Sequence, residues 1–494
     1  MSFSTRNATV VSCLGLAVVC GWADAAHASG FALREQSAEG LGDAYAGQTA
    51  KAYNSSTAYY NPAGMTNLET NEVAGTTTWI SPDANFKGSN SNVVGGSVNG
   101  RQDFNAITAA MVGSVFGVWK ASPDWRFGLS VAVPYGMRSD YKVNWGGRYQ
   151  ALASDITDVD VSMVTAYRIN DHWSVGGGPR VDYLKVRLSQ AVNFNAIGLS
   201  AAQSYAAGAS QAATAAAQLQ NAAQAAAAAG QAQAAAAYAA QAQAAASQAR
   251  TLAANAQTTA SWGDGLSKLE GDDYAVGYNL GVLYELDRNT RFGLDYRSRS
   301  SHTLSGTVTN QTPATLSLAG APVAGRFSNQ NATGKITLPD SLNIGVYHDI
   351  NSRWAVMSDI QWTHWSLFQQ LNVIGANGQA ISSTQENWQD TWFFSLGTHY
   401  KIGDKWVLHG GVAFDQSPVK DQYRTARVPD SDRYWLSTGV SYIISANTEA
   451  HLGYTHIFAD KATIRESANA LAGVLTGSYD NSADTFSSSF VVRF

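Results

Sequence analysis

The stretch "YAVGYNLGVLYEL" (residues 274–286) alternates between two kinds of side chain. Every second residue from Tyr274 to Leu286 is aromatic or aliphatic, whereas most residues between them are small or polar, among them Gly277, Asn279 and Glu285. Successive side chains of a β-strand point to opposite faces of the sheet. The stretch therefore predicts a strand with one apolar face and one face of small and polar groups.

The same alternation recurs along most of the chain. After the turn "DRNT", the stretch "RFGLDYRSR" places Phe292 and Leu294 opposite Asp295 and Arg297, and similar stretches are "WRFGLSVAV" (125–133), "WVLHGGVAF" (406–414), "RYWLSTGVSYI" (433–443) and "FSSSFVVRF" (486–494). Aromatic residues stand at both ends of the apolar faces, and the other faces carry small, polar and ionic groups. This is the reverse of a soluble β-sandwich, and it is typical of a barrel with lipid outside and a polar lumen inside.

The number and spacing of these stretches predict the architecture. Counting from residue 73 gives about fourteen strands, and short connections such as "ASPD" (121–124), "IND" (169–171), "INS" (350–352) and "GD" (403–404) alternate with long ones. Backbone groups inside a bilayer are satisfied only by helices or closed barrels. We therefore expect an all-β, fourteen-stranded antiparallel transmembrane β-barrel over residues 73–494. Its short turns should be periplasmic and its long loops extracellular.

The N-terminus indicates export. Arg6 precedes an apolar run at residues 10–20, and "AHA" at 26–28 offers a cleavage site, so residues 1–28 are predicted to be a signal peptide. Both cysteines, Cys13 and Cys20, lie within it. The mature chain would then be cysteine-free, which excludes disulfides, thiolate catalysis and cysteine metal sites. Only 14% of the 494 residues are charged and the net charge is −5, so nothing indicates a nucleic-acid partner.

Residues 29–72 lack sustained alternation and precede the first predicted strand. A barrel of fourteen strands encloses a lumen wider than side chains alone can fill. We therefore predict that this segment plugs the lumen as an N-terminal hatch. It contains "YYNPAGM" (59–65), in which Asn61-Pro62-Ala63 forms a turn signal, because Pro62 fixes its own φ and pushes Asn61 out of the helical region.

A long insert divides the predicted barrel. No charged residue occurs between Arg187 and Arg250, and residues 200–257 are mostly Ala, Gln and Ser. Ala and Gln favour helices, and Gly208 and Gly230 are plausible breaks, so the extracellular loop 193–271 should carry a helical hairpin with a helix over 209–229. Glutamines recur without an apolar stripe, which argues against a transmembrane helix.

Several stretches together resemble a known family. They are "SGFALREQSAEGLGDAYAG" (29–47), "YNPAGM", "GVLYELDRNTRFGLDYRS", "WSLFQQL" and "SPVKDQYRTARVPDSDRYWLS" (417–437), and their order and spacing are similar to the FadL/TodX family of outer-membrane transporters for long-chain fatty acids and other hydrophobic compounds. The resemblance implies a hatch whose Asn61, Pro62 and Ala63 lie against a kinked third strand. In this chain that strand reads "LSVAVPYGM", where Pro134 cannot donate to a ladder and Gly136 adds freedom. The alternative is that Pro134 simply ends the strand.

The resemblance also implies ligand-pocket residues. Phe31 resembles a pocket-lining residue of the family. The two basic positions that receive a fatty-acid carboxylate appear here as Gln190 and Thr384, which are uncharged. Two explanations are open. Arg187 or Lys185 could bind the carboxylate after a small register shift, although strict alternation places them on the opposite face of the strand. Alternatively, the ligand is an uncharged hydrocarbon or aromatic compound.

The resulting hypothesis is passive uptake of a hydrophobic molecule, which leaves sideways through the barrel wall after a hatch rearrangement. The expected location is the outer membrane of a Gram-negative bacterium, in contact with lipid and lipopolysaccharide, as a monomer and without a cofactor. The histidines form no recognisable Ser/His/Asp pattern and no metal-ligand or nucleotide motif is visible, so an enzyme is not expected. A general porin or an adhesin is the remaining alternative.

Overall fold

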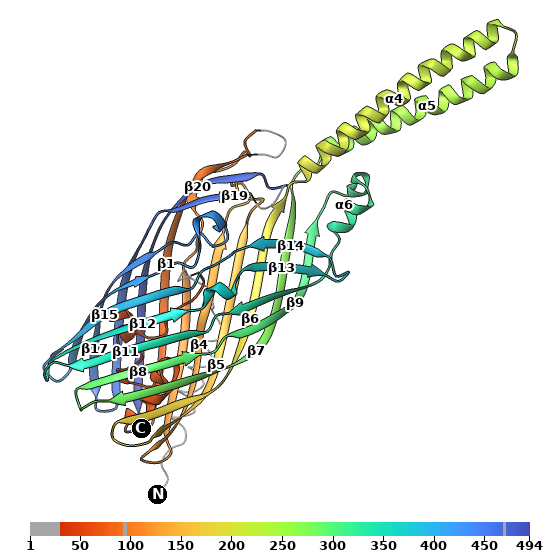
Figure 1. Cartoon of the computed structure of the whole chain (residues 1–494). Helices are drawn as coiled ribbons and strands as arrows, with labels where there is room; N and C mark the ends of the chain where they lie inside the picture. The colour runs from red at the N-terminus through yellow and green to blue at the C-terminus, as the bar shows by residue number, and fades with distance from the viewer. Residues whose placement is uncertain (1–29, 92–95, 468–470) are drawn as a thin grey trace.

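The computed structural model of the chain describes residues 30–91, 96–467 and 471–494, so the predicted signal peptide at residues 1–28 lies outside the described residues. The wall is one closed antiparallel sheet (Figure 1). Its uninterrupted strands are β1 (Glu72–Ser91), β3 (Ala110–Lys120), β4 (Trp125–Asp140), β5 (Ala153–Arg168), β6 (Trp173–Val192), β7 (Gly265–Glu285), β16 (Trp406–Asp415), β17 (Arg433–Ser445), β18 (Thr448–Ala459) and β20 (Val474–Arg493).

Four further wall strands are each interrupted once. They consist of β8 (Thr290–Arg297) with β9 (Ser300–Gln311), β10 (Gln330–Leu338) with β11 (Ser341–Asp349), β12 (Trp354–Thr363) with β13 (Gln370–Gly375), and β14 (Ala380–Gln385) with β15 (Thr391–Ile402). Counting each pair once gives the fourteen strands that the sequence predicts. Two short strands, β2 (Asp103–Asn105) and β19 (Ala462–Glu466), extend the sheet at the long-loop end.

The barrel closes between its first and last strands. β1 and β20 pair over their whole length, from Glu72↔Arg493 to Ser91↔Val474. The prediction for "YAVGYNLGVLYEL" is confirmed, because Tyr274, Val276, Tyr278 and Leu280 are 48–72% exposed on the outer face while Asn279 is fully buried inside. Within the described residues, no helix is long and apolar enough to cross a membrane.

The hatch fills the lumen, as the sequence predicts. Residues 30–68 are almost entirely buried and form α2 (Ala38–Gly42), α3 (Thr57–Tyr60) and the 3-10 helix η1 (Pro62–Asn67), joined by irregular turns. The Ser37 hydroxyl accepts a hydrogen bond from Gly40 N and so caps α2. Because β1 begins at Glu72, the hatch ends one residue earlier than its predicted limit.

The Ala/Gln-rich insert is an antiparallel helical hairpin that projects from the long-loop end (Figure 1). α4 (Phe194–Ala228) runs through Gly208 without a break, so the predicted break there is wrong, whereas Gly230 forms the turn with φ +72° before α5 (Ala232–Ala260). A single glycine costs a helix only about 1 kcal/mol, which the many alanines around it offset. Beside the base of the hairpin lie η2 (Leu316–Ala319) and α6 (Ala321–Arg326), and η3 (Trp365–Leu367) and η4 (Asp421–Tyr423) lie in other connections.

Candidate functional site

The third wall strand, β4, contains a bulge at the proline that the sequence singles out. Ala132 pairs with Asp160 of β5 and Tyr135 pairs with Asp158, so Val133 and Pro134 together face one residue of β5. The strand continues to Asp140, and Pro134 therefore does not mark its end. A bulge of this kind bends the strand and disrupts its ladder.

The ladder between β3 and β4 stops just before this bulge. The two strands pair from Lys120↔Arg126 to Val115↔Val131 and no further. Beyond that point the hatch takes the place of β3: Leu33 N donates to Pro134 O at 2.7 Å, and Gly136 N donates to Phe31 O at 2.8 Å. Ala32 is the bridge partner of Tyr135. Between Val133 and Gly136, the backbone groups on this edge of β4 are thus satisfied by a segment of the plug instead of by the wall. The wall contact resumes at Ser139, the bridge partner of Ile107.

The side chain of Gln36 reinforces this contact. Its amide nitrogen donates to Val133 O at 2.8 Å, and its amide oxygen accepts from Val133 N at 3.3 Å. Both polar groups of the bulged residue are therefore bound by the hatch. The hatch segment at the bulge is residues 31–36.

The Asn61-Pro62-Ala63 motif lies against a different part of the barrel wall. Asn61 Nδ2 donates to Thr49 O at 2.7 Å and to Val282 O of β7 at 3.0 Å, while its Oδ1 accepts from Ala63 N at 3.1 Å. A Cβ at Gly176 of β6 would lie 2.6 Å from Ala63 N, so only glycine permits this approach. The expectation that the motif packs beside the kink before Gly136 is wrong: it lies against β6 and β7.

The interruptions of neighbouring wall strands lie side by side. Ser341, at the start of β11, pairs with both Arg297 and Thr363, and Thr363 pairs with Thr391, so the breaks at 298–299, 339–340, 364–369 and 386–390 form one row. At this row the chain turns aromatic side chains into the lumen. Trp365 and Trp388 are buried there, with ring centroids 4.9 Å apart.

Phe31 lies at the centre of this aromatic cluster. Its ring centroid is 4.9 Å from that of Trp365, 5.5 Å from Trp388, 6.0 Å from Tyr135 and 6.1 Å from Phe368. Phe31 thus joins the row of interruptions to the bulge of β4. Since its side chain is 1% exposed, it packs inside the cluster and does not line either of the two cavities described next.

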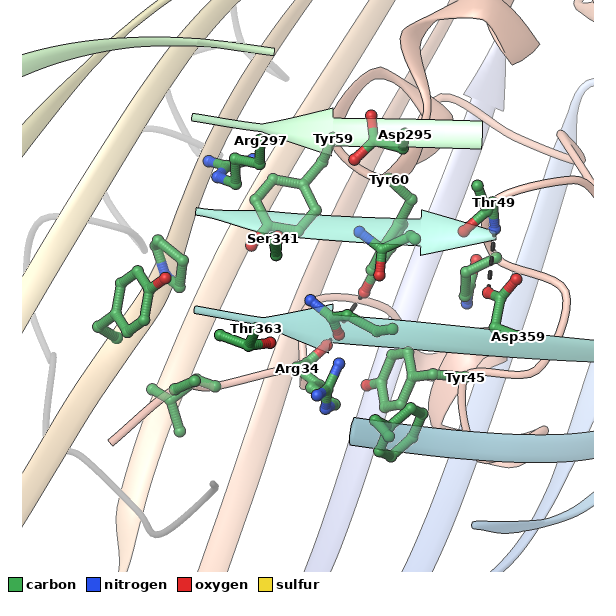
Figure 2. A pocket seen from close by; sticks show the side chains of 18 of the residues that line it. Arg34, Tyr45, Thr49, Tyr59, Tyr60, Asp295, Arg297, Ser341, Asp359 and Thr363 are labelled. Atoms are coloured by element: carbon green, nitrogen blue, oxygen red, sulfur yellow. Dashed lines mark hydrogen bonds between the residues drawn. The ribbon is translucent and has the colours of Figure 1, made fainter. Parts of the chain in front are cut away.

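The inner cavity, of about 100 Å³, lies between the hatch and the wall on one side of the cluster (Figure 2). It has apolar walls from Leu33, Tyr135 and Trp365. Two of its charged groups are paired: Arg297 Nη2 lies 2.6 Å from Asp160 Oδ2, and Asp359 Oδ2 accepts a hydrogen bond from Thr49 N at 3.1 Å.

The outer cavity is larger, about 490 Å³, and opens among the long loops. Gln190 of β6 and Thr384 of β14 both line it. The structure thus brings together the two positions that the family resemblance places at the ligand carboxylate. Apolar walls come from residues on β6, β7, β9, β13 and β14, which are Leu188, Leu269, Val308, Leu371, Val373 and Ile381. The charged residues of the lining are Arg326, the last residue of α6, and Glu386, Arg427 and Glu466.

Arg427 supplies the cation that Gln190 and Thr384 lack. Its guanidinium donates to Gln190 Oε1 at 2.9 Å, Ser154 Oγ at 3.3 Å and Ala153 O at 3.1 Å, all of which are neutral acceptors. Among the residues that the structure describes, no carboxylate lies within 4.0 Å of it. A buried guanidinium held only by neutral groups retains much of its attraction for an anion.

Burial raises the pKa of two acidic groups near Arg427. Glu386 lies in the interruption between β14 and β15, on the long-loop side of the membrane belt, and burial raises its pKa to about 8 although Trp388 Nε1 donates to it. Burial also raises the pKa of Glu466, on β19, to about 6. Near neutral pH the cavity therefore contains a positive Arg427, a mostly protonated Glu386 and a mostly ionised Glu466.

Arg187 and Lys185 do not reach this cavity. Both point to the outer face of β6, where Arg187 Nε lies 3.0 Å from Glu270 Oε1 and Lys185 Nζ lies 3.3 Å from the same oxygen. β6 pairs with β5 and β7 in continuous register at this height, so no register shift brings either side chain inward. The positive charge in this cavity comes instead from Arg427, in the loop between β16 and β17.

Sequence reasoning missed two sets of residues. Arg427 stands within the quoted stretch 417–437, but nothing in a loop sequence indicates which strand the loop folds against. Asp43, His399 and His409 also come together, buried between the hatch and β15 and β16. The two histidines are five residues before and five after Asp404, the middle residue of the three-residue turn 403–405, and they therefore face each other across the hairpin. The two-residue turn that the sequence predicts at 403–404 would not pair them.

A closed fourteen-stranded wall with an outward apolar belt, a buried N-terminal plug and a ladder completed by that plug defines a plugged outer-membrane β-barrel. Residues 19–494 match the family described as outer membrane protein transport protein (OMPP1/FadL/TodX), and the chain belongs to this family.

Individual relatives agree with this assignment. The chain is similar to the long-chain fatty acid transport protein of Escherichia coli K12, with 28% identity over 446 residues that cover 89% of this chain and 90% of the relative. The crystal structure of a Pseudomonas aeruginosa FadL homologue superposes with a TM-score of 0.75 at 21% identity, covering 94% of this chain and all of that one. The Pseudomonas putida toluene transporter TodX gives a TM-score of 0.61 at 15% identity, covering 92% and 98%.

Proposed function

We propose that the protein is a passive outer-membrane channel through which long-chain fatty acids, or closely related amphiphiles, enter the cell. The molecule binds in the outer cavity, passes the aromatic cluster when the hatch rearranges, and leaves sideways between β3 and β4. Transfer of an acyl chain into lipid recovers roughly 0.8 kcal/mol per CH₂, whereas the polar lumen offers no such gain.

The observation that carries this proposal is the replacement of β3 by hatch residues 31–36 along β4. A wall strand whose partner is part of a plug loses that partner when the plug moves, and no covalent or wall hydrogen bond has to break. Phe31 belongs to the same segment and lies at the centre of the cluster. Movement of residues 31–36 therefore opens the aromatic cluster and the β3–β4 seam together.

A disulfide across this contact tests the gate. Ala32 and Tyr135 face each other as a non-hydrogen-bonded antiparallel pair, since the flanking bonds run from Leu33 N and Gly136 N. Such pairs have Cα atoms about 4.5 Å apart, which suits a disulfide. In the variant Ala32→Cys/Tyr135→Cys, the oxidised protein should lose uptake of labelled oleate and regain it after reduction.

The matched controls are the two single-cysteine variants under the same oxidant, which should transport equally with and without reductant. Equal uptake by the oxidised and reduced double variant would show that residues 31–36 do not gate the channel.

Arg427 is the reason for preferring a carboxylate ligand. It donates to Gln190 and lines the cavity that Gln190 and Thr384 share, and it has only neutral partners. The purified barrel should bind oleate at least tenfold more tightly than oleyl alcohol, and Arg427→Gln should remove this preference, since a charge-assisted hydrogen bond contributes about 1.5–3 kcal/mol. Arg187→Gln, which changes a cation outside the cavity, is the matched control and should keep the preference.

Uptake of an uncharged aliphatic or aromatic hydrocarbon is the second candidate. The observation in its favour is that Gln190 and Thr384 are neutral and that Arg427 already has four acceptors on neighbouring segments. Equal binding of oleate and oleyl alcohol, unchanged in Arg427→Gln, would select this candidate.

A further inference from the structure

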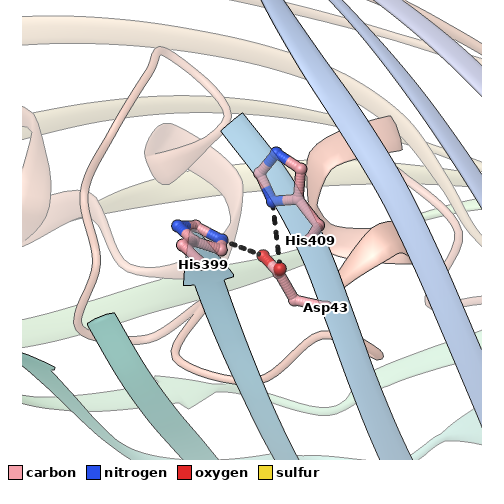
Figure 3. Close-up of side chains that lie close together, drawn as sticks. All are labelled: Asp43, His399 and His409. Carbon is pink, nitrogen blue, oxygen red and sulfur yellow. Dashed lines mark hydrogen bonds and ion pairs between the residues drawn. The ribbon is translucent and has the colours of Figure 1, made fainter. Parts of the chain in front are cut away.

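Asp43 of the hatch is enclosed by side chains from two adjacent wall strands (Figure 3). His399 Nε2 of β15 lies 2.7 Å from Asp43 Oδ2, and His409 Nδ1 of β16 lies 3.1 Å from Asp43 Oδ1. The two imidazole rings meet edge to face, with centroids 4.3 Å apart. All three side chains are buried.

We propose that Asp43, His399 and His409 form a binding site for a divalent transition-metal ion of the zinc type, which links the hatch to the barrel wall. Two imidazole nitrogens and one carboxylate oxygen are a common three-residue ligand set for such ions, with a water in the fourth position. Their ligand atoms all lie within 4.8 Å of one another, and each comes from a different segment of the chain.

The spacing of the ligand atoms agrees with a metal site. Ligands bound tetrahedrally at about 2.0–2.1 Å from zinc lie about 3.3 Å from one another. Each imidazole nitrogen lies close to a different oxygen of Asp43, at 2.7 and 3.1 Å, and one ligand atom from each of the three residues lies within 4.8 Å of the other two.

A second layer of polar groups orients His409. Its other ring nitrogen, Nε2, lies 2.6 Å from Ser441 Oγ, and the same oxygen lies 2.6 Å from His451 Nδ1. Metal-bound histidines almost always place their second nitrogen on such a partner, which sets the tautomer that binds the ion. Ser441 and His451 pair directly across β17 and β18, so the wall itself holds this arrangement.

Lys51 is the group that competes with an ion at Asp43. Its Nζ lies 2.8 Å from Asp43 Oδ2 and 3.5 Å from Glu39 Oε1. Glu39 Oε1 is buried and accepts no hydrogen bond, while Glu39 Oε2 is bound by Asn54. Lys51 can therefore move from Asp43 towards Glu39, which frees the Asp43 carboxylate for a metal and shortens the existing ion pair with Glu39 Oε1.

The position of the site gives it an entry path. His399 and His409 lie three residues from the ends of the short turn 403–405, at the short-turn end of the barrel. The short turns of outer-membrane barrels face the periplasm. An ion would reach the cluster from that side, and it would hold the hatch by Asp43 without touching the outer cavity.

The test uses the untagged mature chain, purified in detergent, treated with EDTA and desalted. Titration with Co²⁺ should give the visible absorption of a low-coordinate nitrogen and oxygen site that saturates at one equivalent and is displaced by Zn²⁺. Asp43→Asn, His399→Asn and His409→Asn should each weaken binding at least tenfold. His348→Asn, which removes an exposed histidine whose Nδ1 lies 2.9 Å from Thr290 Oγ1, is the matched control and should bind like the unaltered protein.

Heat-modifiable migration on a gel verifies that each variant is folded. Failure of the unaltered protein to bind either ion would overturn the proposal and leave Asp43 as a hydrogen-bonded contact between hatch and wall. Binding that persists in His399→Asn and His409→Asn would also overturn it. The outcome does not depend on the transported molecule, because binding is measured without one.

Discussion

Two seams of the same wall are built in opposite ways. Where β1 meets β20, twenty consecutive residue pairs close the barrel, and the partners are wall strands on both sides of β1. Where β3 meets β4, pairing ends after six residue pairs and the hatch completes the ladder. The first seam needs nothing but the wall, whereas the second is complete only while the plug is in place. A barrel can therefore keep its closure and still contain a seam whose ladder depends on the plug.

The largest expected effect comes from breaking the first seam. Thr78 pairs with both Ser487 and Val112, so its N–H donates within the wall on one side or the other. Thr78→Pro removes that donor from the middle of a sheet, at a cost of about 3 kcal/mol or more. We expect the heat-modifiable folded band to disappear.

Thr78→Ala is the matched control at the same position. It loses the hydroxyl contacts with Ser487 Oγ at 2.7 Å and Glu35 O at 3.1 Å but keeps the ladder. Each lost hydrogen bond costs about 1 kcal/mol, so this variant should fold and unfold at a lower temperature. If Thr78→Pro assembles as well as Thr78→Ala, continuity of the β1 ladder is not what closes the barrel.

The interrupted side of the wall also carries a titratable group into the outer cavity. The pKa of Glu386 is raised to about 8, so the group is mostly neutral at pH 7 and becomes an anion as the pH rises through 8. A second negative charge near a bound carboxylate costs about 1–2 kcal/mol at an effective dielectric constant of 20. Oleate binding should thus weaken about tenfold between pH 7 and pH 9. Glu386→Gln should bind equally at both values, and a fall of the same size in that variant would place the titration elsewhere.

A smaller effect is expected from loosening the second seam. Gln36→Ala removes both amide contacts with Val133 and leaves the backbone bonds of Phe31 and Leu33 in place. The loss of about 1–2 kcal/mol should raise the fraction of open hatch and increase the initial uptake rate of oleate several-fold. Gln389→Ala, which removes an amide contact with Ser417 away from β4, should leave the rate unchanged. An equal increase in both variants would mean that the effect is not specific to the seam.

The smallest effect is expected at a third seam, between β6 and β7. Their pairing is continuous from Trp173↔Tyr284 to Val192↔Gly265, although the whole insert separates them in the chain. Deletion of residues 205–255 shortens α4 and α5 and leaves this ladder intact, and loop length carries little thermodynamic cost. The deleted protein should give the same folded band as the full chain. Loss of that band would make the hairpin part of the barrel's structure.

The outward-facing pattern of the wall was predictable because it depends only on the alternation of residues within each strand. Tyr274 to Leu280 alternate as lipid-facing strands must, and the same holds for Phe292 against Asp295. The row of interruptions was not predictable, because each break in sequence is ordinary and only the register of neighbouring strands aligns them. Pro134 indicated an irregularity in its strand. The segment that replaces β3 there, residues 31–36, lies about a hundred residues earlier in the chain and could not be inferred. Arg427 reaches Gln190 for the same reason: its loop folds across the barrel mouth.

The uncharged hairpin has a mechanical consequence. α4 is 35 residues long, which is about 52 Å at 1.5 Å per residue, and it begins at Phe194, next to the cavity residues Val192 and Asn193. A tilt of 10° at its base displaces the tip at Gly230 by about 9 Å. The length of the hairpin thus magnifies any small rotation at the cavity rim, and a pair of fluorophores on its tip and on a barrel loop would report such a rotation as a change in distance.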